Sequence, residues 1–224
     1  MSCELVVFDW DGTLMDSAAR IVDAVRAAIA ASGLEARSEA EIREVIGLGM
    51  EEAVAALYPG TAAAARVRLA RAYREAFARA VAERPAELFA GVEATLERLE
   101  AAGYLLAVAT GKSRSGLQRD LARAGVAHRF VASRTADECG SKPGPRMLEE
   151  LLAELGVAPG AALMVGDTLF DLQMARHAGV PAVAVSWGVH DAERLRAAGP
   201  EHLIRDIAEL PPWLARHGGS HHAA

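Results

Sequence analysis

Residues 5–14 read Leu-Val-Val-Phe-Asp-Trp-Asp-Gly-Thr-Leu, an apolar run that ends in two carboxylates one residue apart. A short apolar run bounded by a glycine turn predicts a fully buried strand. In open α/β sheets, ligands bind in the crevice beyond the carboxyl ends of the strands. Because residues i and i+2 of an extended segment point the same way, we expect Asp9 and Asp11 to converge on one cation. A hard divalent ion such as Mg²⁺ would relieve the repulsion between these carboxylates.

The pair of carboxylates, Asp9 and Asp11, has other interpretations. Two aspartates in a turn are more often solvated turn residues than metal ligands. An EF-hand loop starting at Asp9 is excluded, because Leu14 stands at the glycine position and Arg20 at the position of the bidentate glutamate. The longer string from Phe8 to Ser17 is far more specific than the pair alone. It resembles the first signature motif of the haloacid dehalogenase superfamily, and within that superfamily the motif of the small-molecule phosphatases.

Composition limits the class of protein. The chain has 224 residues, of which 52% are hydrophobic and 24% charged, so we expect one large domain or one domain with an insertion. A net charge of -6 argues against nucleic acid or an anionic membrane as the main partner. No apolar run approaches the ~18 residues of a membrane span. Glu4 and the lack of a basic N-terminal segment argue against a signal peptide. Cys3 and Cys139 have no metal-binding spacing, and reduced cysteines are the default inside the cell, so we expect a cytoplasmic location.

Short apolar runs alternate with helical patterns along most of the chain. This alternation is typical of a parallel sheet with crossover helices, and we therefore predict a Rossmann-like α/β core. The predicted strands are Leu5–Phe8, Leu105–Ala109, Phe130–Ala132, Ala162–Val165, Ala182–Val185 and, with a weaker pattern, His202–Ile204.

A long stretch without a strand pattern separates the first two predicted strands. Apolar residues recur there at helical spacing, as at Leu69, Tyr73 and Phe77. We therefore predict a helical cap inserted after the first strand. The predicted division is residues 1–15 and 87–216 for the core, 16–86 for the cap, and 217–224 for a Gly-, Ser- and His-rich tail without fixed structure.

A second candidate site follows the predicted strand that ends near residue 109, where the sequence reads Thr110-Gly111-Lys112-Ser113. A threonine hydroxyl next to backbone amides at a helix start can bind an anion. The same residues are equally compatible with an ordinary N-cap and turn. The string resembles the second motif of the superfamily, which implies that Thr110 and Gly111 bind the phosphoryl group.

The third candidate is Lys142, in the sequence Ser-Lys-Pro-Gly-Pro. A single lysine is normally a solvated surface charge. Prolines at positions 143 and 145 restrict the backbone after it and would aim the side chain. The segment resembles the Lys-Pro motif of the superfamily, which implies that Lys142 neutralises the charge of the nucleophile and the phosphate.

The fourth candidate is the segment Gly166-Asp167-Thr168-Leu169-Phe170-Asp171, which follows a predicted strand and opens a helical pattern. Its polar residues could simply cap that helix. Two further carboxylates at a strand end are also what a metal site begun by Asp9 and Asp11 still needs. The string resembles the fourth motif of the superfamily.

All four motifs occur in the expected order, and the chain most closely resembles phosphoglycolate phosphatases and their relatives. The resemblance implies a Mg²⁺-dependent phosphatase acting on a small phosphate ester. It implies that Asp9 is the nucleophile that becomes an aspartyl phosphate and that Asp11 is the general acid and base. It implies that Mg²⁺ is held by Asp9, the backbone carbonyl of Asp11 and Asp167, with support from Asp171. Thr110 and Lys142 would stabilise charge on the phosphoryl oxygens.

Three alternatives stay open on the sequence alone. A haloacid dehalogenase would share Asp9 and the cap, but normally lacks the second aspartate and needs no metal. A sugar-phosphate mutase would use the same motifs. A non-enzymatic phospho-acceptor domain would be about half this size and have no cap.

Gly47-Leu48-Gly49 lies between two helical patterns of the predicted cap, where it is either a loop that faces the site or a plain turn. The substrate and the oligomeric state cannot be read from the sequence, although a cap at this position favours a compact acidic ester such as phosphoglycolate.

Overall fold

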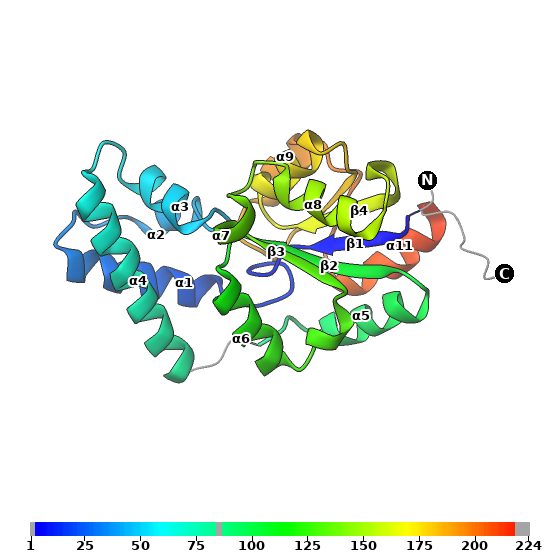
Figure 1. The fold of residues 1–224 in the computed structure, drawn as a ribbon, viewed down its shortest axis with the longest axis horizontal. Coiled ribbons are helices and arrows are strands. Elements are labelled where there is room, and N and C mark those ends of the chain that lie inside the picture. The colour runs from blue at the N-terminus through cyan, green and yellow to red at the C-terminus, as the bar shows by residue number, and fades with distance from the viewer. Residues whose placement is uncertain (1–2, 84–86, 218–224) are drawn as a thin grey trace.

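The computed structural model describes residues 3–83 and 87–217, and its core is a six-stranded parallel sheet with helices on both faces (Figure 1). The strands lie in the order β3-β2-β1-β4-β5-β6. Their bounds are β1 Leu5–Phe8, β2 Leu105–Thr110, β3 Ala132–Thr135, β4 Ala162–Gly166, β5 Ala182–Val185 and β6 His202–Ile204. The prediction of a Rossmann-like parallel sheet is confirmed.

Five of the six predicted strands are found within one residue of their expected bounds, and the prediction of β3 was wrong in position. The apolar residues Phe130 and Val131 precede this strand, which covers Ala132–Thr135. Phe130 instead ends a short 3₁₀ turn, η1 (Ala127–Arg129). β3 lies at the edge of the sheet and pairs with β2 alone. A polar sequence, Ala-Ser-Arg-Thr, is acceptable at that edge, so the apolar run did not mark the strand.

The two faces of the sheet carry separate apolar cores because alternate residues of each strand point to opposite sides. Phe8 of β1 belongs to the core under α5 (Val92–Ala101), α6 (Arg114–Ala124) and α11 (Leu210–His217). Val7 belongs to the core under α8 (Arg146–Leu155), α9 (Leu169–His177) and α10 (Ala192–Ala197). In this three-layer sandwich the inner strands β1, β2, β4 and β5 are buried on both faces, which explains why their sequences are continuous apolar runs.

Along the chain, four helices separate β1 from the rest of the core, and we call this segment, residues 18–83, the helical insertion. They are α1 (Ala18–Ser32), α2 (Glu39–Arg43), α3 (Met50–Leu57) and α4 (Ala63–Glu83). They form a group beside the sheet (Figure 1) around an apolar core of their own, to which Val189 of the sheet domain adds one side chain. Residues 84–86, where the predicted cap ends, and residues 218–224 of the predicted tail lie outside the described residues. His217, which the prediction assigned to the tail, is instead the last residue of α11.

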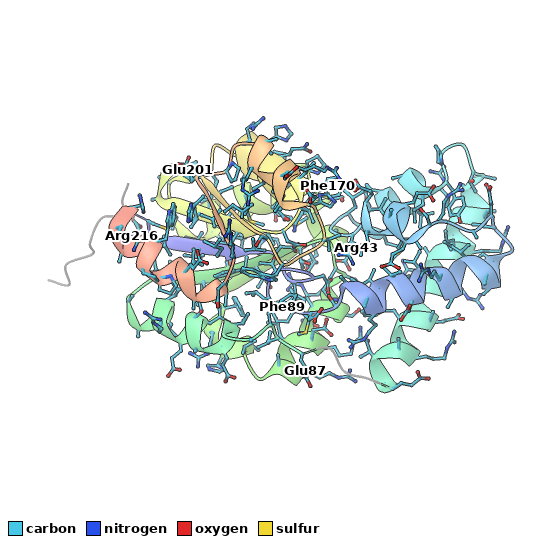
Figure 2. The ribbon with its side chains drawn as sticks, turned by 180° about the vertical axis from the view of Figure 1, so that it is seen from behind. Arg43, Glu87, Phe89, Phe170, Glu201 and Arg216 are labelled. Carbon is cyan, nitrogen blue, oxygen red and sulfur yellow. The ribbon has the colours of Figure 1, made fainter. Side chains whose placement is uncertain are left out.

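The helical insertion contacts the core at defined polar points. Arg43 lies where the two parts meet (Figure 2), and its guanidinium donates to the carbonyl of Gly188 at 3.3 Å. Glu44 forms an ion pair with Arg194 of α10. In the part of the chain that the structure describes, no helix is both long and apolar enough to cross a membrane.

The strand order determines where a ligand can bind. From β1 the chain runs outward to β2 and β3, and then returns to place β4 on the other side of β1. Phe8 of β1 lies opposite Val165 of β4, and the amide of Asp9 donates to the carbonyl of Val165 at 2.9 Å. The carboxyl ends of β1 and β4 therefore form the crevice at which open α/β sheets bind their ligands.

Candidate active site

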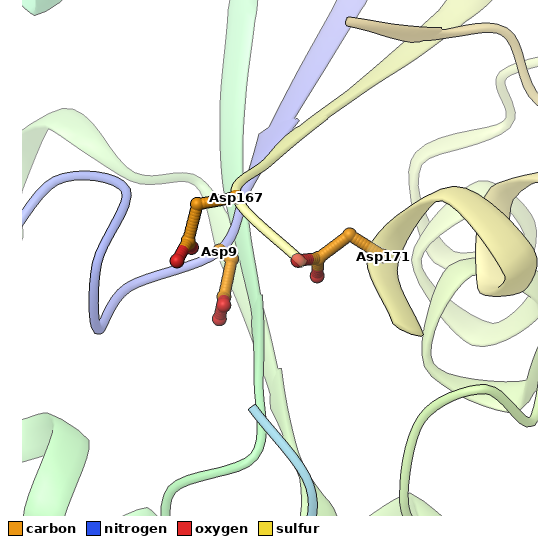
Figure 3. Close-up of side chains that lie close together, drawn as sticks. All are labelled: Asp9, Asp167 and Asp171. Atoms are coloured by element: carbon orange, nitrogen blue, oxygen red, sulfur yellow. The ribbon is translucent and has the colours of Figure 1, made fainter. Parts of the chain in front are cut away.

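Three buried carboxylates meet at the carboxyl ends of β1 and β4 (Figure 3). Asp9 follows β1, Asp167 follows β4, and Asp171 lies in the first turn of α9. Each contributes one oxygen atom to a group in which all three oxygens lie within 4.8 Å of one another. Oxygen donors at this spacing can surround a hard divalent cation such as Mg²⁺.

The carboxylate of Asp9 is the least satisfied group of this cluster. Only 1% of the residue is exposed, yet neither carboxylate oxygen accepts a well-oriented hydrogen bond from the described residues. Its charged neighbour is Lys142, whose Nζ lies 2.7 Å from Oδ1 as an ion pair. Burial raises the pKa of Asp9 well above its usual range, and Lys142 opposes that rise. A buried acceptor with free lone pairs needs a cation or a reacting partner.

Asp167 is held in place from two directions. The Thr13 hydroxyl donates to its Oδ1 at 2.7 Å, and the backbone amide of Val189 donates to its Oδ2 at 2.8 Å. Burial, with Asp171 nearby, raises the pKa of Asp167 to about 7, although the hydroxyl of Thr13 works against this rise. Fixed donors on both oxygens orient the carboxylate toward the cluster, as the partners of a metal ligand do.

Asp171 has both a structural and a site role. Its Oδ2 accepts from the amide of Thr168 at 3.0 Å and from the Thr168 hydroxyl at 2.7 Å, which forms a capping box at the start of α9. Its Oδ1 accepts from Nζ of Lys142 at 2.6 Å. The helix-cap reading of this segment is therefore correct, and the same residue also belongs to the carboxylate cluster.

Lys142 lies between two aspartates and its side chain is fully buried. Burial lowers the pKa of the ammonium, but the carboxylates of Asp171 and Asp9 outweigh that effect and keep the pKa above its usual value. The residue is therefore a fixed positive charge beside Asp9 and not a solvated surface lysine. Asp171 accepts one of its three N–H donors and Asp9 is its ion-pair partner, so the ammonium keeps donor capacity for a further anion.

The carboxylate of Asp11 does not join the cluster, which corrects the expectation that it converges with Asp9 on one cation. Its Oδ1 accepts from Ser17 Oγ at 2.6 Å, and both its oxygens accept from Nζ of Lys112, at 3.1 and 3.0 Å. The two-residue alternation fails because β1 ends at Phe8 and Asp11 lies in the turn that follows. Only the backbone carbonyl of Asp11 stays a candidate for the metal.

Thr110 ends β2 and is buried, with its hydroxyl accepting from the amide of Lys112 at 3.3 Å. Ser113 caps α6, because its hydroxyl accepts from the amide of Gly116. The segment is therefore a real N-cap, as the plainer interpretation of the sequence predicts. Thr110 and Gly111 also line the same cavity as Asp9 and Asp11, which leaves the anion-binding interpretation open.

The loop Gly47-Leu48-Gly49 of the helical insertion faces the site. A Cβ atom on Gly111 would lie 2.5 Å from the carbonyl oxygen of Gly47 and 2.6 Å from that of Leu48, so the two backbones are in direct contact. The amide of Gly49 donates to Ser141 Oγ at 2.7 Å. Of the two interpretations that the sequence left open, the loop that faces the site is the correct one.

A cavity of about 810 Å³ separates the helical insertion from the core. Its core wall carries Asp9, Asp11 and Thr110, and its insertion wall is largely apolar. The insertion wall includes Ile21, Val25, Ala28, Ile42, Val45, Ile46, Met50, Val54, Leu57, Leu69, Tyr73 and Phe77. Two exposed arginines also line the cavity, Arg74 from α4 of the insertion and Arg119 from α6 of the core. The volume lies in the range of ~300–1,000 Å³ that is typical of small-molecule sites.

Sequence reasoning missed the residues that hold the aspartates in place. Thr13 and Ser17 belong to the first motif and hydrogen-bond to Asp167 and Asp11, respectively. Lys112 joins Asp11 to Asp120 of α6, with 2.9 Å from Nζ to Oδ2 of Asp120. Lys112 belongs to the second motif, directly after its glycine. A lysine next to a glycine turn carries no local signal of burial, and its partner Asp120 lies on a helix whose facing residues depend on the whole fold.

Comparisons with known proteins agree with this geometry. The family model of haloacid dehalogenase-like hydrolases matches residues 6–185. A protein of Dickeya dadantii named probable phosphatase IndB is 35% identical over 209 residues, which are 92% of this chain and 91% of that protein. A phosphoglycolate phosphatase of Mesorhizobium japonicum is 35% identical over 222 residues, or 96% of each chain. The crystal structure of a hydrolase from Pseudomonas syringae has the same fold, with a TM-score of 0.87 at 22% identity over 96% of this chain and 100% of that one.

The match spans all four motifs and both sides of the helical insertion. It confirms the resemblance that the four motifs indicate. The chain belongs to the haloacid dehalogenase-like hydrolase family.

Proposed function

We propose that the protein is a Mg²⁺-dependent phosphatase that hydrolyses a small phosphate monoester through an aspartyl phosphate on Asp9. The observation that carries this proposal is the state of Asp9. It is a buried carboxylate whose oxygens accept no well-oriented hydrogen bond from the described residues, at the end of the central strand and 2.7 Å from a buried lysine. A carboxylate in this position is free to act as a nucleophile.

The donor set suits a magnesium ion. Asp9, Asp167 and Asp171 offer only oxygen ligands. Both carboxylate oxygens of Asp9 are without a hydrogen-bond partner among the described residues. We assign the ion to Asp9, Asp167 and the backbone carbonyl of Asp11, with Asp171 in support. When bound, Mg²⁺ would neutralise charge on Asp9 and on the phosphoryl oxygens. Its binding would also offset the buried negative charge that raises the pKa of Asp9.

In the first half of the reaction a carboxylate oxygen of Asp9 attacks phosphorus, and the bond from phosphorus to the ester oxygen breaks. Asp11 gives its proton to the departing oxygen, so the alcohol leaves neutral. In the second half a water attacks phosphorus and transfers a proton to Asp11. The bond from phosphorus to Asp9 then breaks, which releases inorganic phosphate and restores both residues.

Three further groups would stabilise the phosphoryl group. Lys142 would direct an N–H donor that Asp171 does not use at a phosphoryl oxygen, and its positive charge would offset the negative charge that accumulates there. The Thr110 hydroxyl and the backbone at Gly111 line the same cavity and would hold the other oxygens. Because the helical insertion contacts Gly111 through its Gly47–Gly49 loop, it would act as a cap that limits access of water.

The substrate class follows from the size of the cavity and from the relatives. Proteins named phosphoglycolate phosphatase are similar to this chain over nearly its full length, which makes phosphoglycolate the first ester to test. A space of about 810 Å³ with an apolar wall also accommodates larger organic groups. A phosphate-release screen over small phosphorylated metabolites, with and without Mg²⁺, tests the proposal.

We expect release of phosphate from at least one small ester in the presence of Mg²⁺, and none after Asp9→Asn. Release of halide from a haloacid, or transfer of phosphate between positions of a sugar without net release, would contradict the assignment as a phosphatase. A single stoichiometric phosphorylation without turnover would contradict it as well.

A further inference from the structure

Lys112 links Asp11 to both halves of the molecule. Its Nζ lies 3.1 and 3.0 Å from the two carboxylate oxygens of Asp11 and 2.9 Å from Oδ2 of Asp120 on α6. The same ammonium lies 5.1 Å from the centre of the ring of Phe77, which belongs to α4 of the helical insertion. One side chain thus contacts the loop after β1, a helix of the core and a helix of the insertion.

These contacts are buried and mutually supporting. The side chains of Lys112, Asp11 and Asp120 are 7%, 11% and 10% exposed, so water competes little for their charges. Burial alone would lower the pKa of Lys112, and the carboxylates of Asp11 and Asp120 hold it above its usual value instead. A cation over an aromatic face at this distance is attracted to the ring. Lys112 is therefore a fixed positive charge whose position depends on α6 and on α4.

We propose that Lys112 is a positioning residue for the acid–base step: it fixes the carboxylate of Asp11, and Phe77 of α4 fixes Lys112 in turn. The proposal rests on the phosphatase activity and on the role of Asp11 proposed above. It adds a residue to that activity and gives the helical insertion a part in the proton transfer.

The reason is geometric. A general acid works only within about 2.6–3.2 Å of the atom that receives its proton. Asp11 lies in a turn beyond the end of β1, and the hydroxyl of Ser17 holds only its Oδ1. The ammonium of Lys112 contacts both oxygens and so fixes the plane of the carboxyl group. Loss of that contact would leave the group free to rotate about the bond to its Cβ atom.

The proposal predicts a specific dependence on the leaving group. p-Nitrophenolate leaves without a proton, whereas an alkoxide needs one, so only an alkyl ester depends on Asp11 in the first half of the reaction. In Lys112→Met we expect the burst of p-nitrophenolate, which reports phosphorylation of Asp9, to stay within about threefold of wild type. We expect single-turnover cleavage of an alkyl phosphate to fall by roughly 10²-fold, with little change in KM.

Three further variants separate positioning from folding. Lys112→Met combined with Asp120→Asn keeps the net charge of the cluster and should show the same dependence on the leaving group. Lys112→Arg keeps the positive charge and should recover part of the alkyl phosphate rate. Arg71→Met removes an exposed cation of α4 that pairs with Glu75, and it should leave both rates unchanged.

The outcomes are distinct. An equal loss of both rates in Lys112→Met and in the double variant would mean that the residue only supports the fold, and would overturn the proposal. Unchanged rates on both esters would overturn it too. If the wild-type protein gives no burst and no turnover on any ester, the proposed phosphatase activity fails, and this failure is recognised before any variant is made.

Discussion

The two walls of the active-site cavity differ in how they are built. The core wall carries charged and hydroxyl side chains with multiple partners, as at Asp11 and Lys112. The insertion wall is made of apolar side chains from α1 to α4, such as Val25 and Tyr73, with the arginine Arg74 also lining the cavity. The first wall offers the fixed polar groups that chemistry on phosphorus needs, and the second offers a mainly apolar surface to which Glu51, Glu52 and Arg74 add charge. We therefore propose that the core wall supplies the reacting groups and that the insertion wall selects the substrate, with the contact of Phe77 and Lys112 as a point where the insertion also acts on the reaction.

The largest expected effect is on the core wall, where the carboxylates need a cation. Chelation with EDTA should reduce phosphate release to the background rate, and added Mg²⁺ should restore it. Ca²⁺ should fail or inhibit, because it takes more ligands in a looser geometry than Mg²⁺ and misplaces the reacting groups. Initial rates before and after metal readdition measure this. Full phosphate release after exhaustive chelation would contradict the assignment of a metal ion to the carboxylate cluster.

The next effect concerns Asp11, which belongs to the core wall but not to the carboxylate cluster. Asp11→Asn should lower kcat on an alkyl phosphate by roughly 10²-fold or more, the scale of a lost general acid and base. Thermal unfolding should change less than it does in Lys142→Met, where two buried aspartates lose their shared cation. Steady-state kinetics and Tm values of both variants test the contrast. A normal kcat in Asp11→Asn would exclude it from proton transfer.

A smaller effect is expected where the two walls touch. Gly111→Ala places a methyl group 2.5 Å from the carbonyl oxygen of Gly47, so the insertion has to move away from the loop that follows β2. We expect kcat/KM to fall by roughly tenfold, because small misplacements at a reacting centre are costly. Gly160→Ala is the matched control, since nothing lies within 4 Å of the added atom. Equal kinetics in the two variants would mean that closure of the insertion is irrelevant to catalysis.

An effect on one substrate alone should separate the two walls most cleanly. Val25→Phe enlarges a half-buried side chain on the insertion wall and leaves the core wall untouched. We expect kcat/KM for a bulky aryl phosphate to fall by roughly tenfold, with phosphoglycolate changed by less than about twofold, since pocket contacts of this kind discriminate by size. Competition assays with the two esters give the ratio directly. A uniform loss on both esters would show that the insertion wall also sets the reaction rate.

The same contrast explains how far sequence reasoning reached. Asp9 and Asp167 could be placed because each directly follows a buried strand, and the ends of β1 and β4 meet at one edge of the sheet. Lys142 follows no buried strand, and its place in the site was expected from the prolines after it and from the motif that it resembles. β3 was misplaced because an edge strand tolerates polar residues, and its apolar neighbours were mistaken for it. The side-chain direction of Asp11 was missed because two-residue alternation ends with the strand.

The insertion could not be predicted in the same detail. Helical spacing at Leu69 and Phe77 correctly indicated a buried face, and both residues belong to the apolar core of the insertion. Helical spacing does not tell which residues of that face line a cavity. The contact of Phe77 with Lys112 joins residues that are far apart in the chain, and it depends on how α4 packs over the core. Local patterns carry no information of this kind.

The central claim is that Asp9 becomes covalently phosphorylated. The most direct test mixes the protein with p-nitrophenyl phosphate and Mg²⁺, quenches in acid within the first turnover, and locates the phosphoryl group by mass spectrometry of peptides. We predict one phosphoryl group per chain on the peptide that contains Asp9, and none in Asp9→Asn. A phosphoryl group on another residue, or rapid turnover with no adduct at any quench time, would contradict the account.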